Sequence, residues 1–445
     1  MTDWSDRRLH FVGIGGAGMS GLALVCDALG ARVSGSDRAE SSYLRRLRAA
    51  GLEPRVGHDP DNVPEDAEVV RSRAVPNDNP ELVRAHERGQ RVIERGELLA
   101  ELCSEKRLLA VAGTHGKTTT AGMLAHVLRA IGADPAFLVG GELPGAGPAG
   151  APTNAGWGEG VWIVAEADES DASFLQLRPE VAVVTNVELD HLGRWSSRAQ
   201  LLEAFGCFTE PADGLALGAG RELDPVAGDR RTVRFDAERP GPELRLRIPG
   251  RHNLLNARAA LAGLELAGFD VSQSADALAT FPGMLRRLEL KGRRDGAVIY
   301  DDYAHHPTEV TAALATLREM EPHRLIAVFQ PHLYSRTKAM YERFGAALAA
   351  ADEIGVLEVY PAREEPVGEL AGVTGRQVAE AAADRAGGRP VWWLRDIEGA
   401  QRALAPRLRE GDLLVTLGAG DVFRLADALV KDPEAGAADS PGRDG

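Results

Sequence analysis

The sequence has few cysteines, and their positions exclude two kinds of site. Cys26, Cys103 and Cys207 are the only three in 445 residues, and they lie far apart. An odd number at such spacing argues against a disulfide framework and against a zinc site built on cysteine. A reducing cytoplasm is therefore the expected location of the protein.

Basic charge and long apolar runs are also scarce. The chain carries 51 Lys and Arg against 66 Asp and Glu, a net charge of −15, which disfavours nucleic acid and anionic membranes as partners. No apolar run approaches the roughly 20 residues of a membrane-spanning helix, and the acidic N-terminus lacks the apolar core of a signal peptide. A hydrophobic content of 44% is ordinary for a globular protein, and the length suggests about three domains.

The motif around which the chain is organised is the glycine-rich stretch 111–120, VAGTHGKTTT. The apolar run that leads into it predicts a buried strand, and apolar residues at helical spacing follow it. Gly113 and Gly116 permit a tight backbone that directs N–H groups at an anion on a helix N-terminus. Lys117 can reach terminal phosphates and Thr118 can offer a hydroxyl to Mg²⁺. An ordinary glycine-rich turn is the alternative, but the order of these parts favours a phosphate site.

A second glycine-rich turn lies near the N-terminus. Residues 13–18, GIGGAG, follow a short strand and precede a predicted helix from Met19 to Leu29, and a second strand leads to Asp37. This matches the dinucleotide-binding fingerprint, which places a diphosphate on a helix N-terminus without identifying the nucleotide. A turn without any ligand is the alternative. Residues 71–76, which include Ser72, follow a later strand end, where open α/β sheets bind ligands.

Carboxylates follow the next strand of the middle segment. Residues 140–160 are rich in Gly, Pro and Ala and predict a surface loop. Residues 161–166 predict a strand that ends in the acidic cluster 166–171. Glu166 lies at the carboxyl end of this strand, where a Mg²⁺ ligand facing the phosphates is expected. A solvated acidic turn is the alternative.

Two further polar groups follow in the middle segment. Asn186, Asp190 and His191 come after the strand 181–185. Because all three are expected at the same edge of the sheet, a functional site is favoured over a single structural histidine. Asn253 and Asn256 lie three residues apart at the start of an Ala-rich helix and share one face. Their amides suit the edge of a purine, although Asn253 could equally cap the helix. Strands and turns without assigned chemistry are expected over 211–249.

The segment from 284 to 430 predicts a repeat of strands and helices, and hence a parallel sheet. The expected strands are 297–300, 325–329, 353–357, 390–394 and 413–417. Polar clusters follow three of them, at 301–306, 330–336 and 418–421, so a ligand is expected at that edge. Six of the eleven histidines lie in the motifs named so far or in the stretch 250–256 that opens the Ala-rich helix, namely His115, His191, His252, His305, His306 and His332. Residues 431–445 are polar and rich in Gly and Pro, and we expect them to be disordered.

Eight segments in a fixed order carry a family resemblance. They are residues 13–21, 113–119, 166–171, 186–191, 252–256, 286–289, 301–307 and 330–336. In these segments the chain resembles the Mur ligases of peptidoglycan synthesis. The resemblance implies an α/β fold of three domains: a Rossmann-like UDP-sugar domain, a P-loop-type ATPase domain and a Rossmann-like amino-acid domain. The expected ranges are 1–103, 104–283 and 284–430, followed by the tail 431–445.

The resemblance also implies an activity. A Mur ligase of this type joins L-alanine to the lactyl carboxylate of UDP-N-acetylmuramate through an acyl phosphate, with ATP and Mg²⁺. The implied partners are these small molecules, with no nucleic acid and no membrane, and the expected assembly is a monomer or a weak homodimer. The resemblance leaves the general base open, because His191 as a metal ligand would be a poor one.

Site residues follow from the matching positions. Those implied for catalysis are Lys117, Glu166, His191, Arg287 and Asp302. Those implied for ATP are Gly113, Thr114, His115, Gly116, Lys117, Thr118, Thr119, Asn253, Asn256, Arg287 and Asp302. Those implied for the metal are Thr118, Glu166 and His191. Those implied for the UDP-sugar or L-alanine are Gly13, Gly15, Gly16, Gly18, Met19, Ser20, Asp37, Ser72, His305, His332, Tyr334 and Arg336. Whether Arg286 shares the role of Arg287 stays open.

The chain departs from the family pattern in three places. Gly193 stands where the family often has an aspartate, and Glu203 stands near the position of a carbamylated lysine in many Mur ligases. Glu203 could supply the negative charge of the carbamate, or it could be an ordinary carboxylate on a helix surface. Residues 208–249 look shorter than the family norm, so the middle domain is expected to be trimmed.

Three other functions remain to be weighed. A ligase that recycles murein tripeptide would share the fold, although residues 19–21 favour the alanine enzyme. An NAD-dependent dehydrogenase would explain the first glycine-rich turn but leaves Lys117, Glu166 and Arg287 without roles. A non-catalytic nucleotide-binding regulator would not need the polar clusters of the last segment.

Overall fold

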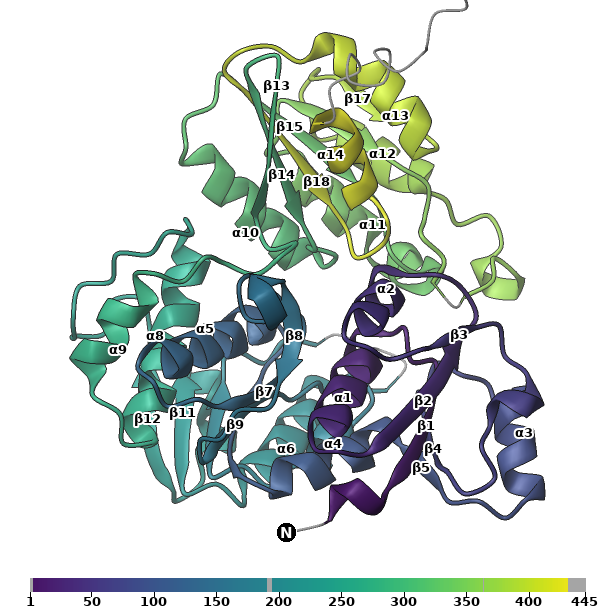
Figure 1. Ribbon diagram of the computed structural model, residues 1–445. Coiled ribbons are helices and arrows are strands. Elements are labelled where there is room, and N and C mark those ends of the chain that lie inside the picture. The colour runs from purple at the N-terminus through teal and green to yellow at the C-terminus, as the bar shows by residue number, and fades with distance from the viewer. Residues whose placement is uncertain (1–2, 190–193, 363, 431–445) are drawn as a thin grey trace, which may run out of the picture. The chain divides into compact units, whose positions relative to one another are not determined.

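The computed structural model describes residues 3–189, 194–362 and 364–430 (Figure 1). Asp190, His191, Gly193 and the tail 431–445 lie outside the described residues, so the expectations for them stay untested. The chain divides into two compact units, the first ending at Met284 and the second beginning at Leu285. The first unit contains a five-stranded and a seven-stranded sheet, and the second contains a six-stranded sheet. The predicted α/β class is confirmed.

The first sheet has the strand order β3-β2-β1-β4-β5 and is parallel throughout. Its strands are β1 Arg8–Val12, β2 Arg32–Asp37, β3 Arg55–Val56, β4 Glu68–Arg71 and β5 Val92–Glu94. Its helices are α1 Ala17–Ala28, α2 Ser42–Ala49, α3 Pro80–Glu87 and α4 Arg95–Ser104. This is the Rossmann order, and it places the carboxyl end of β1 where the strand order reverses. The first glycine-rich turn leaves the sheet at that point.

The second sheet has the order β12-β11-β10-β6-β9-β7-β8, with β8 antiparallel to β7. Its strands are β6 Arg107–Ala112, β7 Ala136–Leu143, β8 Thr153–Gly156, β9 Trp162–Glu166, β10 Val181–Val184, β11 Gly214–Gly218 and β12 Arg231–Phe235. Its helices are α5 Lys117–Ala130, α6 Arg198–Thr209, α7 Asp224–Ala227, α8 Arg251–Leu266 and α9 Val271–Leu278. β6 pairs with β9 and β10 and is buried from Leu108 onward, which explains its unbroken apolar sequence.

The loop expected over 140–160 is partly wrong. β7 continues to Leu143, and β8 returns antiparallel to it over Thr153–Gly156. The many glycines and alanines of this stretch give no alternation of apolar and polar residues, which is the sequence pattern of a strand. The strands form here through pairing and tertiary packing. Asn154 and Ala155 are buried where β8 packs close to Gly21 of α1.

One apolar core joins the two sheets of the first unit. It includes Leu98 and Leu102 from α4 together with Phe174 and Phe205 from the second sheet's flank. The Phe174 ring lies 5.3 Å from that of Phe205, centroid to centroid, within the range of favourable aromatic contact. Because α4 packs into this shared core, the domain boundary at residue 103 stays a prediction.

The second unit has the strand order β13-β14-β18-β15-β16-β17. Its strands are β13 Glu289–Arg294, β14 Ala297–Asp302, β15 Arg324–Phe329, β16 Glu353–Val356, β17 Val391–Trp393 and β18 Asp412–Leu417. Its helices are α10 Pro307–Arg318, α11 Tyr334–Leu348, α12 Gly375–Ala383, α13 Ile397–Leu404 and α14 Phe423–Val430. The five predicted strands are confirmed and parallel. β13 was not predicted; it is an antiparallel edge strand of largely charged residues, which lacks an apolar face.

Short 3-10 helices connect these elements. They lie at Trp4–Asp6, Pro60–Asn62, Pro148–Gly150, Ser173–Gln176, Arg221–Leu223, Gly368–Leu370 and Ala405–Arg407. Among the described residues, no helix is both long enough and apolar enough to cross a membrane.

Candidate active site

The predicted phosphate loop lies between β6 and α5, so the expected order of strand, glycine-rich turn and helix is confirmed. Gly113 has φ +133°, and Gly116 caps α5 in the left-handed region with φ +83°. A side chain at Gly113 would clash with Thr185 Oγ1, and one at Gly116 would clash with Asn256 Oδ1. Both positions therefore need glycine for conformation and for space. The turn is built to bring the loop backbone close to its neighbours.

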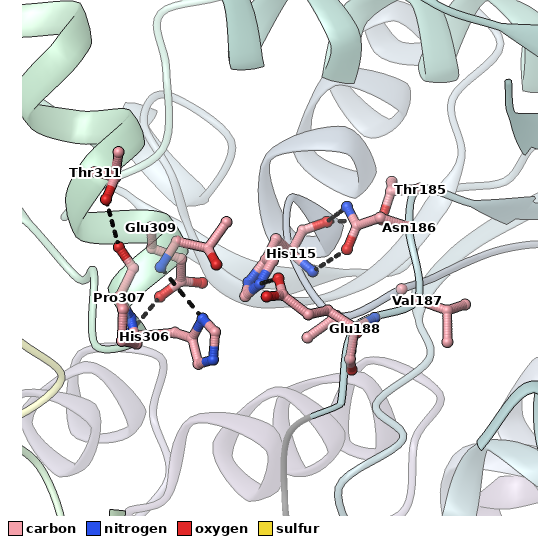
Figure 2. A network of polar contacts seen from close by, with 12 residues as sticks. His115, Thr185, Asn186, Val187, Glu188, His306, Pro307, Glu309 and Thr311 are labelled. Atoms are coloured by element: carbon pink, nitrogen blue, oxygen red, sulfur yellow. Dashed lines mark hydrogen bonds and ion pairs between the residues drawn. The ribbon is translucent and has the colours of Figure 1, made fainter. Parts of the chain in front are cut away.

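The loop is held in place from the end of β10 (Figure 2). The Asn186 side chain accepts a hydrogen bond from His115 N and donates one to His115 O, both over 2.9 Å. Thr185 Oγ1 donates to the same carbonyl over 2.6 Å. His115 Nε2 lies 2.9 Å from Glu188 Oε2. Asn186 thus acts on the loop backbone, which explains its place in the predicted cluster.

The Lys117 ammonium has three partners within the first unit. It donates to Gly113 O over 2.6 Å, to Thr114 O over 3.3 Å and to Glu169 Oε2 over 2.9 Å. Burial by itself would lower the lysine pKa, but the carboxylates around it, with Glu169 foremost, outweigh burial and raise the pKa above its ordinary value. Lys117 is therefore charged at neutral pH. Sequence reasoning recognised the acidic cluster but not that Glu169 is the member that pairs with Lys117.

Thr118 and Glu166 meet at the start of α5, as the sequence predicted. Thr118 Oγ1 donates to Glu166 Oε1 over 3.1 Å, and Gly140 N donates to Glu166 Oε2 over 2.7 Å. A side chain at Gly140 would approach Glu166 Oε2 to 2.6 Å, so glycine leaves room for the carboxylate. A hydroxyl and a carboxylate are hard oxygen donors of the kind Mg²⁺ prefers, and the residues therefore fit this metal.

Asn253 and Asn256 are buried on the first turns of α8. The N-cap of α8 is Gly250, with φ +100°, so the alternative that Asn253 caps the helix is wrong. Asn253 Nδ2 instead donates to Pro249 O over 2.7 Å. Asn256 Nδ2 lies 3.4 Å from Asn253 Oδ1, and Asn256 adjoins Gly116 of the phosphate loop. The structure thus places the predicted amide pair beside the loop.

The backbone N–H groups of the first glycine-rich turn are hydrogen-bonded to the end of β2 and to the turn itself. Gly13 has φ +84°, and Gly13 N donates to Ser36 O over 2.9 Å. Gly15 N donates to Asp37 Oδ2 over 2.9 Å. Gly16 N donates to Gly13 O over 3.2 Å. The acidic residue of the fingerprint therefore binds the turn itself.

The other predicted substrate residues of this domain surround the turn. Met19 and Ser20 are buried in α1, and Met19 belongs to the shared apolar core. Ser72 N donates to Val12 O over 3.4 Å, which brings the end of β4 to the end of β1. Gly18 lies 3.3 Å from Arg95 Nη1, measured from the position a Cβ would take.

Two polar residues beside α1 were missed by sequence reasoning. Asn154 Nδ2 donates to Ala17 O over 2.7 Å. Arg95 Nη2 donates to Asp171 Oδ2 and to Ser173 Oγ, both over 3.2 Å. Arg95 follows β5 directly, so the rule for strand ends could have found it. Asn154 had no such signal, because it lies in the stretch expected to be a loop.

In the second unit, Asp302 binds two backbone N–H groups, one of which belongs to Leu288, the residue after Arg287. Asp302 Oδ2 accepts from Leu288 N and Oδ1 accepts from Ala304 N, both over 2.7 Å. Burial raises the pKa of Asp302 to about 6, against the opposing effect of the Arg287 charge. The guanidinium of Arg287 lies 5.1 Å from the Tyr303 ring centroid, where it can make a cation–π contact.

The side chain of Arg286 contacts residues of β14, of α14 and of the loop after β18 in the second unit. Its Nε donates to Asp301 Oδ2 over 3.0 Å and its Nη2 to Gly418 O over 2.6 Å. Its guanidinium also lies between the rings of Tyr303 and Phe423, 4.9 and 4.7 Å from their centroids. Arg286 is thus an ion-pair partner of Asp301, and whether it shares the role implied for Arg287 stays a prediction.

The predicted alanine-pocket residues gather at the end of β15. The rings of His305 and His332 lie 6.1 Å apart, and His332 stacks on Tyr360 at 5.8 Å. Arg336 Nη1 lies 3.4 Å from His332 Nδ1. Tyr334 begins α11. Tyr360 lies in the loop that follows β16, the strand next to β15. Sequence reasoning missed this residue.

The chain is similar to known proteins along most of its length. Three family descriptions match: "Mur ligase family, catalytic domain" at 8–107, "Mur ligase middle domain" at 111–216 and "Mur ligase, glutamate ligase domain" at 286–420. A curated relative from Renibacterium salmoninarum, named UDP-N-acetylmuramate–L-alanine ligase, is 43% identical, with 95% of each chain covered. The chain belongs to the Mur ligase family.

Solved Mur ligase structures share the fold. The UDP-N-acetylmuramate–alanine ligase of Thermotoga maritima is 29% identical, with a TM-score of 0.83 over 97% of this chain and 100% of that one. A murein peptide ligase from Psychrobacter arcticus is 24% identical, with a TM-score of 0.68 over 96% of this chain and 99% of that one. The first supports the three-domain Mur ligase fold and the second shows likeness of fold alone. Mur ligases are ATP-dependent ligases, and this chain is a ligase.

Glu203 is one of the positions at which this chain departs from the Mur ligase pattern. Glu203 is exposed on α6, whereas Leu201, Ala204 and Phe205 of the same helix are buried. This is the arrangement expected of an ordinary carboxylate on the surface of an amphipathic helix. The structure therefore favours that reading of Glu203 over a substitute for a carbamate.

Proposed function

We propose that this Mur ligase joins L-alanine to the lactyl carboxylate of UDP-N-acetylmuramate with ATP, in the synthesis of peptidoglycan precursors. The observation that carries the proposal is the joint presence, at one turn, of a charged Lys117 and the Thr118–Glu166 pair. Two relatives that carry the name of this activity match 95% of this chain and 95% and 99% of their own chains, and they support the choice of substrates. The proposed location is the cytoplasm.

The chemistry requires activation of the carboxylate. An amine does not displace oxide from a carboxylate at neutral pH, because oxide is a poor leaving group. Transfer of the ATP γ-phosphoryl group to a lactyl carboxylate oxygen breaks the bond to ADP, which leaves, and gives an acyl phosphate. The alanine nitrogen then attacks the acyl carbon and loses a proton, and phosphate leaves. Lys117 would offset charge on the transferring group, where positioning and electrostatics carry most of the catalysis.

The metal proposed for this site is Mg²⁺. Thr118 and Glu166 would hold it, together with the proposed ligand His191, which lies outside the described residues. When bound, the ion supplies positive charge to phosphate oxygens. Thr118 and Glu166 themselves fix the donor oxygens at the helix start, and the loop residues Gly113 to Thr119 would offer N–H groups to the nucleotide.

The remaining assignments follow the family pattern. Asn253 and Asn256 are proposed for the nucleotide, with Arg287 and Asp302 completing the set. Residues proposed for the L-alanine pocket are His305, His332, Tyr334 and Arg336. The amine's proton has no assigned acceptor, and the proposed assembly is a monomer or a weak homodimer.

The first glycine-rich turn is proposed to hold the UDP diphosphate. Asp37 supports UDP over NAD, because its carboxylate accepts from Gly15 N and is thereby engaged with the protein backbone. In the dinucleotide fingerprint the acidic residue binds a ribose hydroxyl. Arg95, which packs against Gly18, adds a positive charge beside the start of α1.

The test is an assay of phosphate release with the full chain. The protein is incubated with ATP, Mg²⁺, UDP-N-acetylmuramate and one amine, either L-alanine or murein tripeptide. We expect phosphate release that depends on L-alanine and on the UDP-sugar together. Release with the tripeptide alone would replace the proposal with the recycling activity, and the absence of release with both amines would overturn it.

A further inference from the structure

The carboxylates after β9 each have a different partner. Glu166 accepts from Thr118 Oγ1 and Gly140 N. Asp168 accepts from the backbone and hydroxyl of Ser170. Asp171 accepts from Ser173 N and from Arg95. Glu169 is the member that accepts from Lys117 Nζ, so its role differs from that of Glu166, the proposed metal ligand.

Glu169 is fixed in position and shielded from water. Its residue is 1% exposed. Its carbonyl accepts from Trp195 Nε1 over 3.1 Å and from Ala172 N over 3.2 Å. Because two donors hold the Glu169 carbonyl, the backbone at this residue is fixed, and this limits where the side chain can lie. The carboxylate oxygen Oε2 lies 2.9 Å from Lys117 Nζ.

The ammonium of Lys117 has no donor to spare in this arrangement. It carries three N–H groups, and it has three acceptors: Gly113 O, Thr114 O and Glu169 Oε2. Two of these acceptors belong to the loop itself, and only the third carries a full negative charge. A phosphate oxygen that binds Lys117 must therefore take the place of an existing acceptor, and Glu169 is the one it resembles in charge.

We propose that Glu169 is an internal substitute for nucleotide phosphate, which holds Lys117 in the nucleotide-free enzyme and releases it when ATP binds. The inference rests on the proposed function, in which Lys117 binds the ATP phosphates. Glu169 acts through Lys117 and is a positioning residue. Its carboxylate keeps the buried lysine charged and aimed along the loop, at the expense of ATP affinity.

This role makes Glu169→Gln bind ATP more tightly. The amide oxygen can still accept from Lys117, but the charge that competes with phosphate is gone. In calorimetry with Mg²⁺ and ATP and no other substrate, we expect the Kd to fall about tenfold. Without nucleotide, the Tm of the variant should fall, because a buried ammonium loses its charged partner. ATP should then raise the Tm of Glu169→Gln more than it raises that of the wild type.

Two comparisons separate competition at Lys117 from a general change of charge. Glu203→Gln removes one negative charge from the exposed face of α6 and should leave the Kd for ATP unchanged. In a Lys117→Met background, Glu169→Gln should bring no further gain, because the residue through which it acts is missing. An equal gain in that background would overturn the proposal.

The outcomes distinguish this proposal from the proposed function. If the wild-type chain binds no ATP, the proposed function fails. If the wild type binds ATP and Glu169→Gln binds it equally or more weakly, only the role of Glu169 is overturned. Should Glu169→Gln not fold, Glu169→Asp withdraws the carboxylate by one methylene, and it too should bind ATP more tightly than the wild type; weaker binding would sink the idea.

Discussion

Asp37 Oδ2 accepts a hydrogen bond from Gly15 N over 2.9 Å, so the carboxylate that ends β2 closes the glycine-rich turn that follows β1. A hydrogen bond to a charged acceptor contributes more than one between neutral groups. The turn is therefore shaped by the protein before any diphosphate reaches it.

The first prediction concerns this bond. Asp37→Ala should raise the Kd for UDP-N-acetylmuramate by at least about tenfold, since loss of a charged hydrogen bond costs roughly 1.5–3 kcal/mol. Asp37→Asn keeps an acceptor oxygen and should recover part of the affinity. Calorimetry on the full chain measures both, and NAD should give no signal with the wild type. Tight NAD binding without binding of the UDP-sugar would reverse the assignment of this domain.

The second prediction concerns Lys117. Lys117→Ala should reduce phosphate release by at least about a hundredfold, as for the loss of other preorganised electrostatic groups. Circular dichroism should stay unchanged, because the glycines and Asn186 still shape the loop. Near-normal turnover in a folded variant would remove the loop from the ATP site.

The third prediction compares two neighbouring arginines. Arg286→Met should lower the free energy of unfolding of the second unit by about 3 kcal/mol, because it leaves the buried Asp301 without its cation. Arg287→Met should change stability far less and should instead reduce ligation. Urea unfolding and phosphate release on both variants check this. Equal stability losses would mean that Arg287 is also structural.

The fourth prediction is a pH dependence from Asp302. Its folded-state pKa is raised by burial to about 6 from the ordinary 3.8, so the folded state holds this proton more tightly than the unfolded state does. Its contribution to stability is therefore greatest at low pH and is lost as pH rises from about 4 through 6. The full difference corresponds to about 3 kcal/mol.

The measurement is the difference between the wild type and Asp302→Asn in urea unfolding at pH 7.5 and pH 5. Relative to the variant, the wild type should gain about 1.4 kcal/mol of unfolding free energy at the lower pH, and the contributions of other carboxylates cancel in the difference. A constant difference across this range would show that Asp302 titrates normally.

The fifth prediction concerns Glu203. Its carboxylate is exposed on α6, so Glu203→Gln should keep turnover within about twofold of the wild type, as surface substitutions usually do. The activity of both proteins should be independent of added bicarbonate. A large loss across a Mg²⁺ titration would restore the idea that Glu203 replaces a carbamate.

Local sequence determined the elements that carry the site. The apolar run before Gly113, the two glycines and the helical spacing after Lys117 dictate a strand, a tight turn and a helix, because each is a short-range property of the backbone. The fingerprint at 13–18 and the strands at 297–300, 325–329 and 413–417 follow from the same local rules. The family resemblance added the roles of the residues.

Tertiary structure decided which side chains meet. Nothing local says that Glu169 accepts from Lys117, that Asp37 binds Gly15, or that Arg286 pairs with Asp301. These choices depend on strand order and on backbone anchors far away in the chain, such as Trp195 against Glu169. The strand β8 was hidden for the same reason: its small residues become a strand through pairing with β7 and packing near α1. Pairing and burial are long-range properties, which a pattern of neighbouring residues does not contain.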